Sequence, residues 1–302
     1  MTELVFRALT ESDAHLFSTL PATTLLGRSL VGHGYSPVHE GGQYRPDWTW
    51  VALREGRVVA RAAWWGAPDD DKPMVLDWFD FADGEAEAAV RLLRAAPLHA
   101  EYDLLLPPGW REQPEVRVEA QARIDAAIAA GLAPLVERYR YVWTPGCGLP
   151  ERPGRLTFRP EPDDDVVLDV LRRIGEGSLD AHARHTADRD GAEAAAREEL
   201  DLLKWLPSPR GWWQLAYDAE GTQVGIHVPA GNLSGPCVGF IGVLPEQRGH
   251  GYAYELLVDC THRLVAEGAE WIAAATDQQN FPMAAAFAKA GYPVTQERIN
   301  LV

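Results

Sequence analysis

The 302-residue sequence is poor in cysteine, in long apolar runs and in metal-ligand spacings, and each shortage excludes a class of protein. Three widely spaced cysteines, Cys147, Cys237 and Cys260, give no disulfide or zinc framework and fit a reducing compartment, so we expect the cytoplasm. No apolar stretch is long enough to cross a membrane, and the opening MTELVFRALTESD lacks the pattern of a signal peptide. Apart from a loose HARH, the nine histidines show no ligand spacing, so we predict no metal.

Positive charge is also scarce. Lys and Arg number 28 against 44 Asp and Glu, a net charge of -16 that both halves of the chain share. This balance opposes nonspecific binding to nucleic acid, which needs a basic footprint, and it favours a cationic partner or substrate. Acidity that only keeps the protein dissolved is the alternative interpretation. The composition leaves the oligomeric state open.

Three stretches of the first half recur in the second half in the same order. LVFRALTESDAHLF resembles LTFRPEPDDDVVLD. WTWVALREGRVVARAAWWG resembles WWQLAYDAEGTQVGIHVPAG, and a turn glycine, Gly56 or Gly221, lies between two alternating apolar runs in each. That pattern is typical of a β-hairpin. AAGLAPLVERYRYV resembles AKAGYPVTQERINLV, with Gly131 matching Gly291. The chain therefore contains a repeat.

Each half reads as strand, helices, hairpin, strand, helix, strand, helix, strand. This order predicts the α/β class, a mixed central sheet flanked by helices in each half. Between the halves lies TPGCGLPERPGR, residues 144–155, whose proline and glycine content is typical of a linker. We therefore predict two tandem domains, residues 1–145 and residues 155–302.

The segment RGHGYA, residues 248–253, joins an apolar run to a helical pattern. A helix start leaves backbone N–H groups unpaired, and a glycine-rich approach lets those groups reach an anion, so this joint predicts a phosphate cradle. Arg248 and His250 add positive character. The helix has an apolar stripe at Ala253, Leu256, Leu257, Cys260 and Leu264. The corresponding joint of the first half, ADGEAE, is acidic and would repel a phosphate.

Residues 248–253 resemble the R/Q-x-x-G-x-G/A motif of the GNAT family of acetyl-CoA-dependent N-acetyltransferases. Downstream, NFPMAAAFAKAGY resembles the second motif of that family, and the strand EWIAAAT lies between the two. The resemblance covers residues 156–302 and implies a tandem GNAT protein whose first domain is degenerate. It also implies acetyl-CoA as cofactor, with Asn280 on the cofactor arm. The implied cofactor-binding residues are Ile241, Gly242, Val243, Arg248, Gly249, His250, Gly251, Tyr252, Ala253, Tyr254, Asn280 and Met283.

The usual proton-transfer residues of the family are missing. Phe287 stands where a tyrosine acid is common, Ala275 stands where some members have a glutamate base, and CVGFIGV has no carboxylate. An amine must lose a proton before it attacks, so another group has to accept that proton. Our candidates are Asp277 and His182. The less favoured candidates are Asp180, His185 and His227. The bland interpretation of each, a solvated or capping side chain, stays open.

The resemblance implies N-acetylation of an amine on a small molecule, with a cationic acceptor favoured by the net charge. Two alternatives remain at this stage. One is a non-catalytic acyl-CoA-binding sensor or scaffold, and the other is acetylation of a protein or peptide amine. No nucleic acid and no membrane enter either interpretation.

Overall fold

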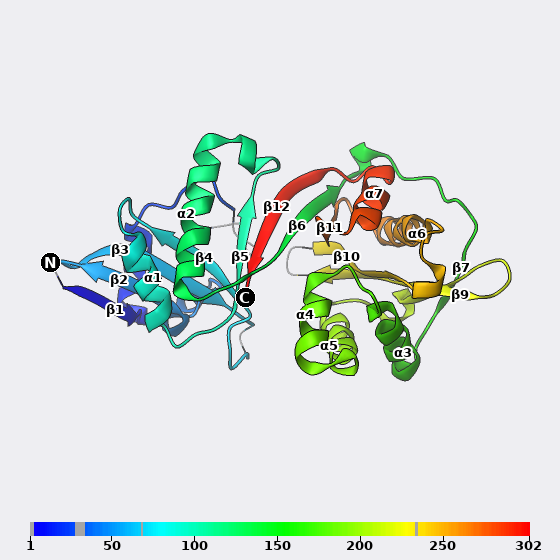
Figure 1. Cartoon of the computed structure of the whole chain (residues 1–302), viewed down its shortest axis with the longest axis horizontal. Coiled ribbons are helices and arrows are strands. Elements are labelled where there is room, and N and C mark those ends of the chain that lie inside the picture. The colour runs from blue at the N-terminus through cyan, green and yellow to red at the C-terminus, as the bar shows by residue number, and fades with distance from the viewer. Residues whose placement is uncertain (1–2, 28–33, 68, 233–234) are drawn as a thin grey trace. The chain divides into compact units, whose positions relative to one another are not determined.

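The computed structural model describes residues 3–27, 34–67, 69–232 and 235–302. The chain divides into two compact units (Figure 1). Unit 1 consists of Met1–Glu137 together with Gln296–Val302. Unit 2 consists of Arg138–Thr295.

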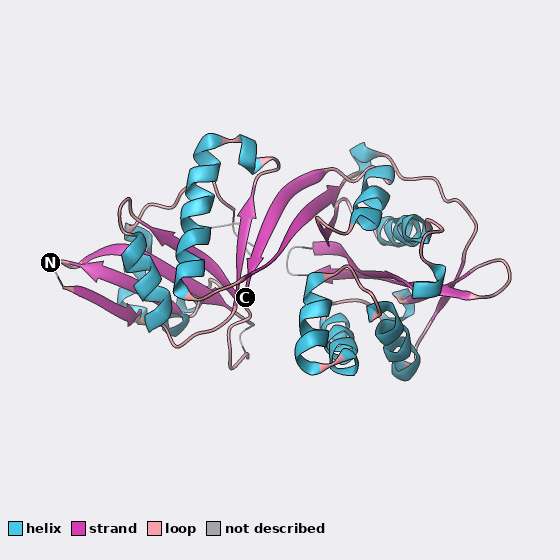
Figure 2. Ribbon diagram, in the orientation of Figure 1, coloured by secondary structure: helices cyan, strands magenta, loops and turns pink. Residues whose placement is uncertain are grey.

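Unit 1 is a mixed sheet with two helices. Its strands follow one another across the sheet as β1 (Leu4–Ala8), β2 (Thr49–Arg54), β3 (Arg57–Trp65), β4 (Val75–Phe81), β5 (Glu101–Leu106) and β12 (Val294–Leu301). Strands β4 and β5 are parallel, and the other neighbours are antiparallel. Figure 2 shows α1 (Ala86–Ala95) and α2 (Pro114–Ala130) beside each other against these strands.

Unit 2 repeats this plan and carries more helices. Its strands run across the sheet as β7 (Thr157–Pro160), β8 (Gln214–Tyr217), β9 (Gln223–Asn232), β10 (Gly235–Val243), β11 (Ile272–Asp277) and β6 (Pro134–Trp143). Helices α6 (Tyr252–Ala266) and α7 (Phe281–Lys289) lie on one face of this sheet. On the other face lie α3 (Asp164–Gly175), α4 (Ala181–Asp190) and α5 (Ala192–Trp205), as Figure 1 shows.

The element order predicted from the repeat is confirmed from the hairpins onward. The hairpins β2–β3 and β8–β9 are antiparallel pairs, and each is followed by strand, helix, strand, helix and strand. The halves differ after their first strands. The second half has three α-helices there, whereas the described part of the first half has a 3₁₀ segment, Glu11–Thr19, which buries Phe17.

The compact units do not coincide with the predicted domains. Strand β12, from the end of the chain, pairs with β5 of unit 1. Residues 138–143 of β6, from the first half, pair with β11 of unit 2. Each unit is thus completed by a strand from the opposite half of the chain, which the three matching sequence stretches do not reveal.

The segment 144–155, interpreted above as a linker, belongs to unit 2 and is bonded to α6. Arg152 forms an ion pair with Asp259 at 2.7 Å, and His262 Nε2 lies 2.8 Å from the carbonyl oxygen of Pro150. We call residues 144–155 the strap. Its prolines and glycines give an extended path along the helix rather than a free connection between the units.

Among the described residues of unit 1, the joint after β4 forms no phosphate cradle. Glu85, at the start of α1, is held by Arg54 through two hydrogen bonds of 3.0 and 2.8 Å. Within β4 itself, buried Asp80 pairs with buried Arg61 and Arg123, each at 3.0 Å. The two arginines compensate the buried carboxylate, so their charges are already paired and offer no open site to an incoming anion.

Throughout the part of the chain that the structure describes, no helix combines the length and apolar character needed to span a membrane.

Candidate functional site

The candidate site begins where β10 and β11 separate. Cys237 and Ala273 form the single residue pair that joins these parallel strands among the described residues. Beyond it, β10 stays paired with β9 as far as Val243, and β11 stays paired with β6 as far as Asp277. A register shift between Val238 and Phe240 distorts β10 at the same point. The edge of β10 that leads to residues 241–243 is therefore open.

The predicted cradle follows β10 after a short 3₁₀ turn, Pro245–Gln247. Gly249 and Gly251 have φ angles of 84° and 77°, a left-handed conformation that glycine adopts without strain. Helix α6 begins after Gly251, which has no side chain to cap it. Helices α3, α4 and α7 start with side-chain caps from Asp163, Asp180 and Asn280, whereas α5, like α6, follows a glycine and has no side-chain cap. The first N–H groups of α6 thus fit an external anion such as the diphosphate of coenzyme A.

Arg248, which the sequence predicts to add positive charge to the cradle, also forms hydrogen bonds within the protein. Its guanidinium donates to the carbonyl oxygens of Ile174 and Glu176, at 2.7 and 2.8 Å, where α3 ends. A cation at the C-terminal end of a helix is favourable, because the last carbonyl groups there have no partner within the helix. Arg248 therefore ties the cradle to α3, and its hydrogen bonds are directed to protein carbonyls.

His250 and Tyr252 lie together at the cradle. The two rings stack, with centroids 5.6 Å apart, and His250 Nδ1 lies 3.2 Å from the carbonyl oxygen of Gln247. Val243 and Tyr252 pack against one apolar cluster with Leu256. Gly242 has no room for a side chain, because an added Cβ would lie 2.6 Å from Ile174.

Other predicted cofactor residues meet in a second apolar cluster of unit 2. Four predicted residues pack against it, namely Ile241, Ala253, Tyr254 and Met283. Phe287 belongs to its buried part and stacks on Tyr141, with ring centroids 4.3 Å apart, so Phe287 is a core side chain. Asn280 caps α7, since its Oδ1 accepts a 3.3 Å hydrogen bond from Met283 N.

Asp277 lies at the end of β11, where both of its carboxylate oxygens are held. Oδ1 lies 3.0 Å from Arg138 Nε, and Oδ2 accepts a 2.7 Å hydrogen bond from Ala181 N. Burial, together with the nearby negative charge of Asp180, raises the pKa of the Asp277 carboxyl. Asp277 thus fixes the start of α4 beside β6, an arrangement typical of a positioning residue.

Next to Asp277 the structure brings together titratable side chains from several elements. Asp180 caps α4 and lies 3.5 Å from Arg138, and His182 follows in the first turn of α4. Glu199 of α5 interacts electrostatically with all three of these groups. Burial and the charge of Asp180 raise the pKa of the Glu199 carboxyl to about 7. We call Asp180, His182 and Glu199 the acidic cluster.

Sequence reasoning missed Glu199, although a signal was present. In AAAREELDLL, Ala196, Leu200 and Leu203 form the buried face of α5. Glu199 lies three residues after the first and four before the last, so helical periodicity places it on that face. Neighbouring Glu198 is on the exposed side, with its side chain 64% accessible.

The other two histidine candidates lie elsewhere. His185 is exposed on α4. His227 is completely buried in β9, with Nε2 2.9 Å from Asp259 of α6, and burial lowers its pKa. Within the described ranges, no three His, Cys, Asp or Glu side chains are grouped so that they could hold a metal ion.

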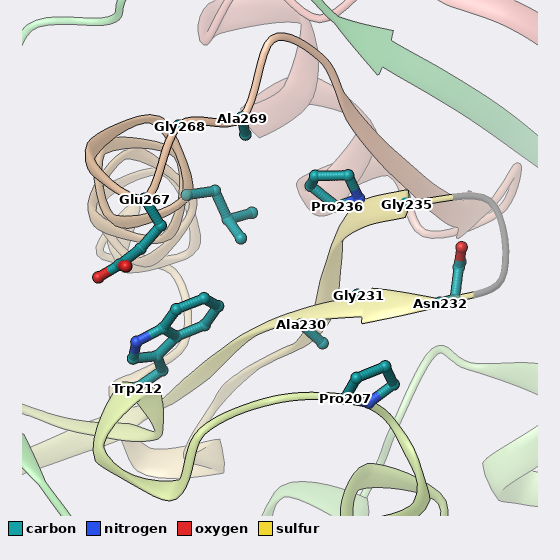
Figure 3. Close-up of a pocket in the computed structure, with 11 residues that line it drawn as sticks. Pro207, Trp212, Ala230, Gly231, Asn232, Gly235, Pro236, Glu267, Gly268 and Ala269 are labelled. Atoms are coloured by element: carbon teal, nitrogen blue, oxygen red, sulfur yellow. The ribbon is translucent and has the colours of Figure 1, made fainter.

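A pocket of about 300 Å³ lies away from this site, near the beginning of β10 and the end of α6 (Figure 3). Trp212, Pro236 and Glu267 are among the residues that line it. The cradle lies at the other ends of these two elements, because it comes after the last residue of β10, Val243, and before the first residue of α6, Tyr252. This pocket is therefore separate from the candidate site.

Comparisons with known proteins agree with this geometry. Residues 182–292 match the family model described as Acetyltransferase (GNAT) family. No curated protein matches the chain in sequence. The chain is similar in fold to a GCN5-related N-acetyltransferase from Sphaerobacter thermophilus, with 15% identity, a TM-score of 0.54, and coverage of 99% of this chain and 94% of that one.

A tandem GNAT protein from the clavulanic acid biosynthesis pathway is similar over 99% of this chain and 98% of its own, with 17% identity and a TM-score of 0.51. A GCN5-related glucosamine N-acetyltransferase region of a fungal GH3 β-N-acetylglucosaminidase matches all of this chain and 38% of that one, with 12% identity and a TM-score of 0.53. At these identities the likeness concerns the fold.

Proposed function

Because the second half of this chain carries a GNAT-family domain within a tandem GNAT fold, we propose that the protein transfers an acetyl group from acetyl-CoA to an amine of a small molecule. Three features of unit 2 together carry the proposal. Unit 2 has an uncapped helix start suited to a diphosphate at α6, and the acidic cluster lies on α4 and α5, the helices of the opposite face of the sheet. The open edge of β10 lies within the sheet, between the face that carries α6 and the face that carries α4 and α5.

Each group has a separate task in this proposal. Acetyl-CoA would supply the activated acetyl thioester. The N–H groups from Gly249 to Ala253 would hold its diphosphate, since the N–H of Tyr254 donates to the carbonyl oxygen of Gly251. Residues 241–243 would align its arm along the open edge of β10. Asp277 would position α4. Asp180 would attract the ammonium form of the acceptor, and Glu199 would accept the proton that the ammonium loses.

His182 and Asp277 were the sequence-based candidates for this proton, and His182 stays a proposal for it. Asp277 is the weaker candidate, because its two oxygens are already engaged with Arg138 and Ala181. Glu199 is favoured because a carboxylate with a pKa of about 7 is well matched to proton transfer at neutral pH.

The rival function is a binding module that holds acyl-CoA without turning it over. Phe287 and Ala275, which replace common proton-transfer residues of the family, favour this rival. Glu199 favours the enzyme, because it provides a proton acceptor at a different place. A protein or peptide amine is the other possible acceptor.

A panel of amines tests the acceptor class. The purified full-length protein is assayed for release of CoA from acetyl-CoA with cationic, neutral and anionic small amines and with a peptide amine. We expect turnover of a cationic small amine, with a KM that rises with salt because ions screen its attraction to the acidic cluster. Equal turnover of anionic amines would contradict the cationic acceptor. If CoA binds but no amine is acetylated, the binding module replaces the enzyme.

We expect one CoA to bind per chain, and Gly251→Asp to weaken its binding by about 30-fold or more, because a carboxylate at the helix start repels the diphosphate. Calorimetric titration measures both values. The matched control is Gly221→Asp in the β8–β9 hairpin, where the backbone φ is 82° and an added Cβ meets nothing within 4 Å. Two equivalent CoA sites, or equal affinities of the two variants, would contradict this expectation.

A further inference from the structure

Arg155, at the end of the strap, contacts the cradle at several points. Its Nη1 and Nη2 each donate to the carbonyl oxygen of His250 at 3.2 Å. Its guanidinium lies 4.9 Å from the ring centroid of Tyr252. The side chain is half-exposed, at 52%, and comes from a segment that the sequence predicted to be a linker. Arg155 lies outside both family motifs, RGHGYA and NFPMAAAFAKAGY.

Arg155 also neutralises a carboxylate that lies close to the cradle. Glu255 is in the first turn of α6, and only 3% of its side chain is accessible. Arg155 forms an ion pair with Glu255 Oε1, and its backbone N–H donates to Oε2 at 3.1 Å. Without Arg155, a buried negative charge would lie four residues after Gly251, close to the helix start where an anion is to bind. Coulomb repulsion at that range is weakly screened, because one of the charges is buried.

The hydrogen bonds to His250 fix the orientation of a peptide group. A trans peptide is planar, so its carbonyl oxygen and the following N–H point in opposite directions. When Arg155 holds the carbonyl of His250, the N–H of Gly251 must point away from Arg155. Gly251, which follows this peptide, has a φ of 77°. Because glycine has no Cβ, the peptide that joins His250 to Gly251 can rotate at low cost. Arg155 therefore opposes a rotation that would turn a carbonyl oxygen, instead of an N–H, toward the anion.

We infer that Arg155 is a positioning residue for the cofactor: it keeps the Gly251 N–H directed at the diphosphate and cancels the charge of Glu255. This inference rests on the proposed binding of CoA by the cradle. Arg155 acts through the loop and through Glu255, and the bound anion need not touch it. The arrangement gives the strap a role in cofactor binding besides covering α6.

The same strap provides a matched control. Arg152 is as exposed as Arg155, at 54%, and it also pairs with a carboxylate of α6, at 2.7 Å from Asp259. Removing either arginine deletes one positive charge from the strap and one ion pair with the same helix. Among these two residues, only Arg155 bonds to the cradle. A difference between their effects therefore reports on the contacts with the cradle.

The test is calorimetric titration of CoA into the full-length protein, with thermal unfolding measured for each variant. We expect Arg155→Ala to weaken CoA binding by about tenfold or more. Arg152→Ala should stay within about threefold of the wild type. Glu255→Gln added to Arg155→Ala should recover much of the lost affinity, because the uncompensated charge is then absent. A loss of folding alone would not produce this recovery. Arg155→Lys keeps the charge with fewer directed donors and should lie between wild type and alanine.

Equal affinities of the Arg155→Ala and Arg152→Ala variants would overturn the inference, and so would a double variant that binds CoA as weakly as Arg155→Ala. If Arg155→Ala shows no unfolding transition, the lysine variant decides, and wild-type affinity in it would also overturn the inference. Failure of the wild-type protein to bind CoA would instead refute the proposed function. The two failures are thus distinguished within one series of titrations.

Discussion

Glu199→Gln is expected to lower kcat/KM for the acceptor amine by about 10²- to 10⁴-fold, the usual contribution of a general base. Burial and the charge of Asp180 raise the pKa of Glu199 to about 7, so the carboxylate forms as the pH passes through neutrality. The wild-type rate should therefore rise with pH around 7, and this rise should be absent in the glutamine variant. A pH–rate profile of kcat/KM between pH 5.5 and 9 checks both effects.

Glu199→Gln, which is expected to lower activity, should raise the free energy of unfolding above pH 7. Because the pKa of Glu199 is higher in the folded protein than its ordinary value of 4.5, the folded state binds more protons than the unfolded state between these two pH values. The free energy of unfolding must then fall as the pH rises from about 4.5 to about 7. Glutamine has no such titration, so the variant should be more stable than the wild type above pH 7. A residue that only supports the fold would lose stability when replaced.

Glu198→Gln is the matched control, since it removes the same charge from the adjacent position of α5, where the side chain is exposed. We expect its pH–rate profile to keep the rise near pH 7 and its turnover to change by less than about threefold. Equal losses in the two glutamine variants would refute the assignment of Glu199. If the rise near pH 7 is lost in His182→Ala and kept in Glu199→Gln, His182 and not Glu199 is the proton acceptor.

The cradle could be predicted from the sequence because its signals are local. Two glycines between a strand and a helix fix the backbone there, and their positive φ angles are as the motif requires. The apolar stripe was also correct, since Leu256, Leu257, Cys260 and Leu264 are buried on α6. Such patterns depend on residues within a few turns of one another, and a single sequence contains that information.

The partners of charged side chains could not be predicted in the same way. Arg248 was expected to favour a phosphate, and it is bonded to carbonyls more than 70 residues earlier in the chain. Arg155 meets Glu255 across 100 residues. These contacts depend on how α3 and the strap pack against α6, and no periodicity in the sequence encodes that packing. Glu199 combines a local and a long-range feature. Helical periodicity could have predicted its position on the buried face of α5, whereas its electrostatic neighbours could not be predicted from the sequence.

The exchange of β6 and β12 was missed for a related reason. Both strands match each other in sequence, AAGLAPLVERYRYV against AKAGYPVTQERINLV. Similar strands have similar preferences for a sheet edge, so the repeat predicts that each half contains such a strand. It does not predict which sheet the strand joins.

Residues 155–302 expressed alone are therefore expected not to fold. This fragment lacks β6, whose Tyr141 and Trp143 are 3% and 2% exposed in unit 2. Removing one large aromatic side chain from a core costs about 3–5 kcal/mol, and a whole domain is stable by only about 5–15 kcal/mol. The fragment also loses the strand partner of β11 and leaves buried Asp277 without Arg138. Thermal unfolding followed by circular dichroism should show no cooperative transition.

A longer fragment, residues 134–302, is the control, because it restores β6 and the strap along α6. It should unfold cooperatively and bind CoA. A third fragment, residues 134–302 with Arg138→Ala, separates the apolar contribution of β6 from the charge of Asp277. It should be less stable than its parent by about 3–5 kcal/mol, the cost of leaving one partner of a buried ion pair alone. A cooperative transition and CoA binding in residues 155–302 would show instead that unit 2 needs no strand from the first half, and the cradle would then be independent of β6.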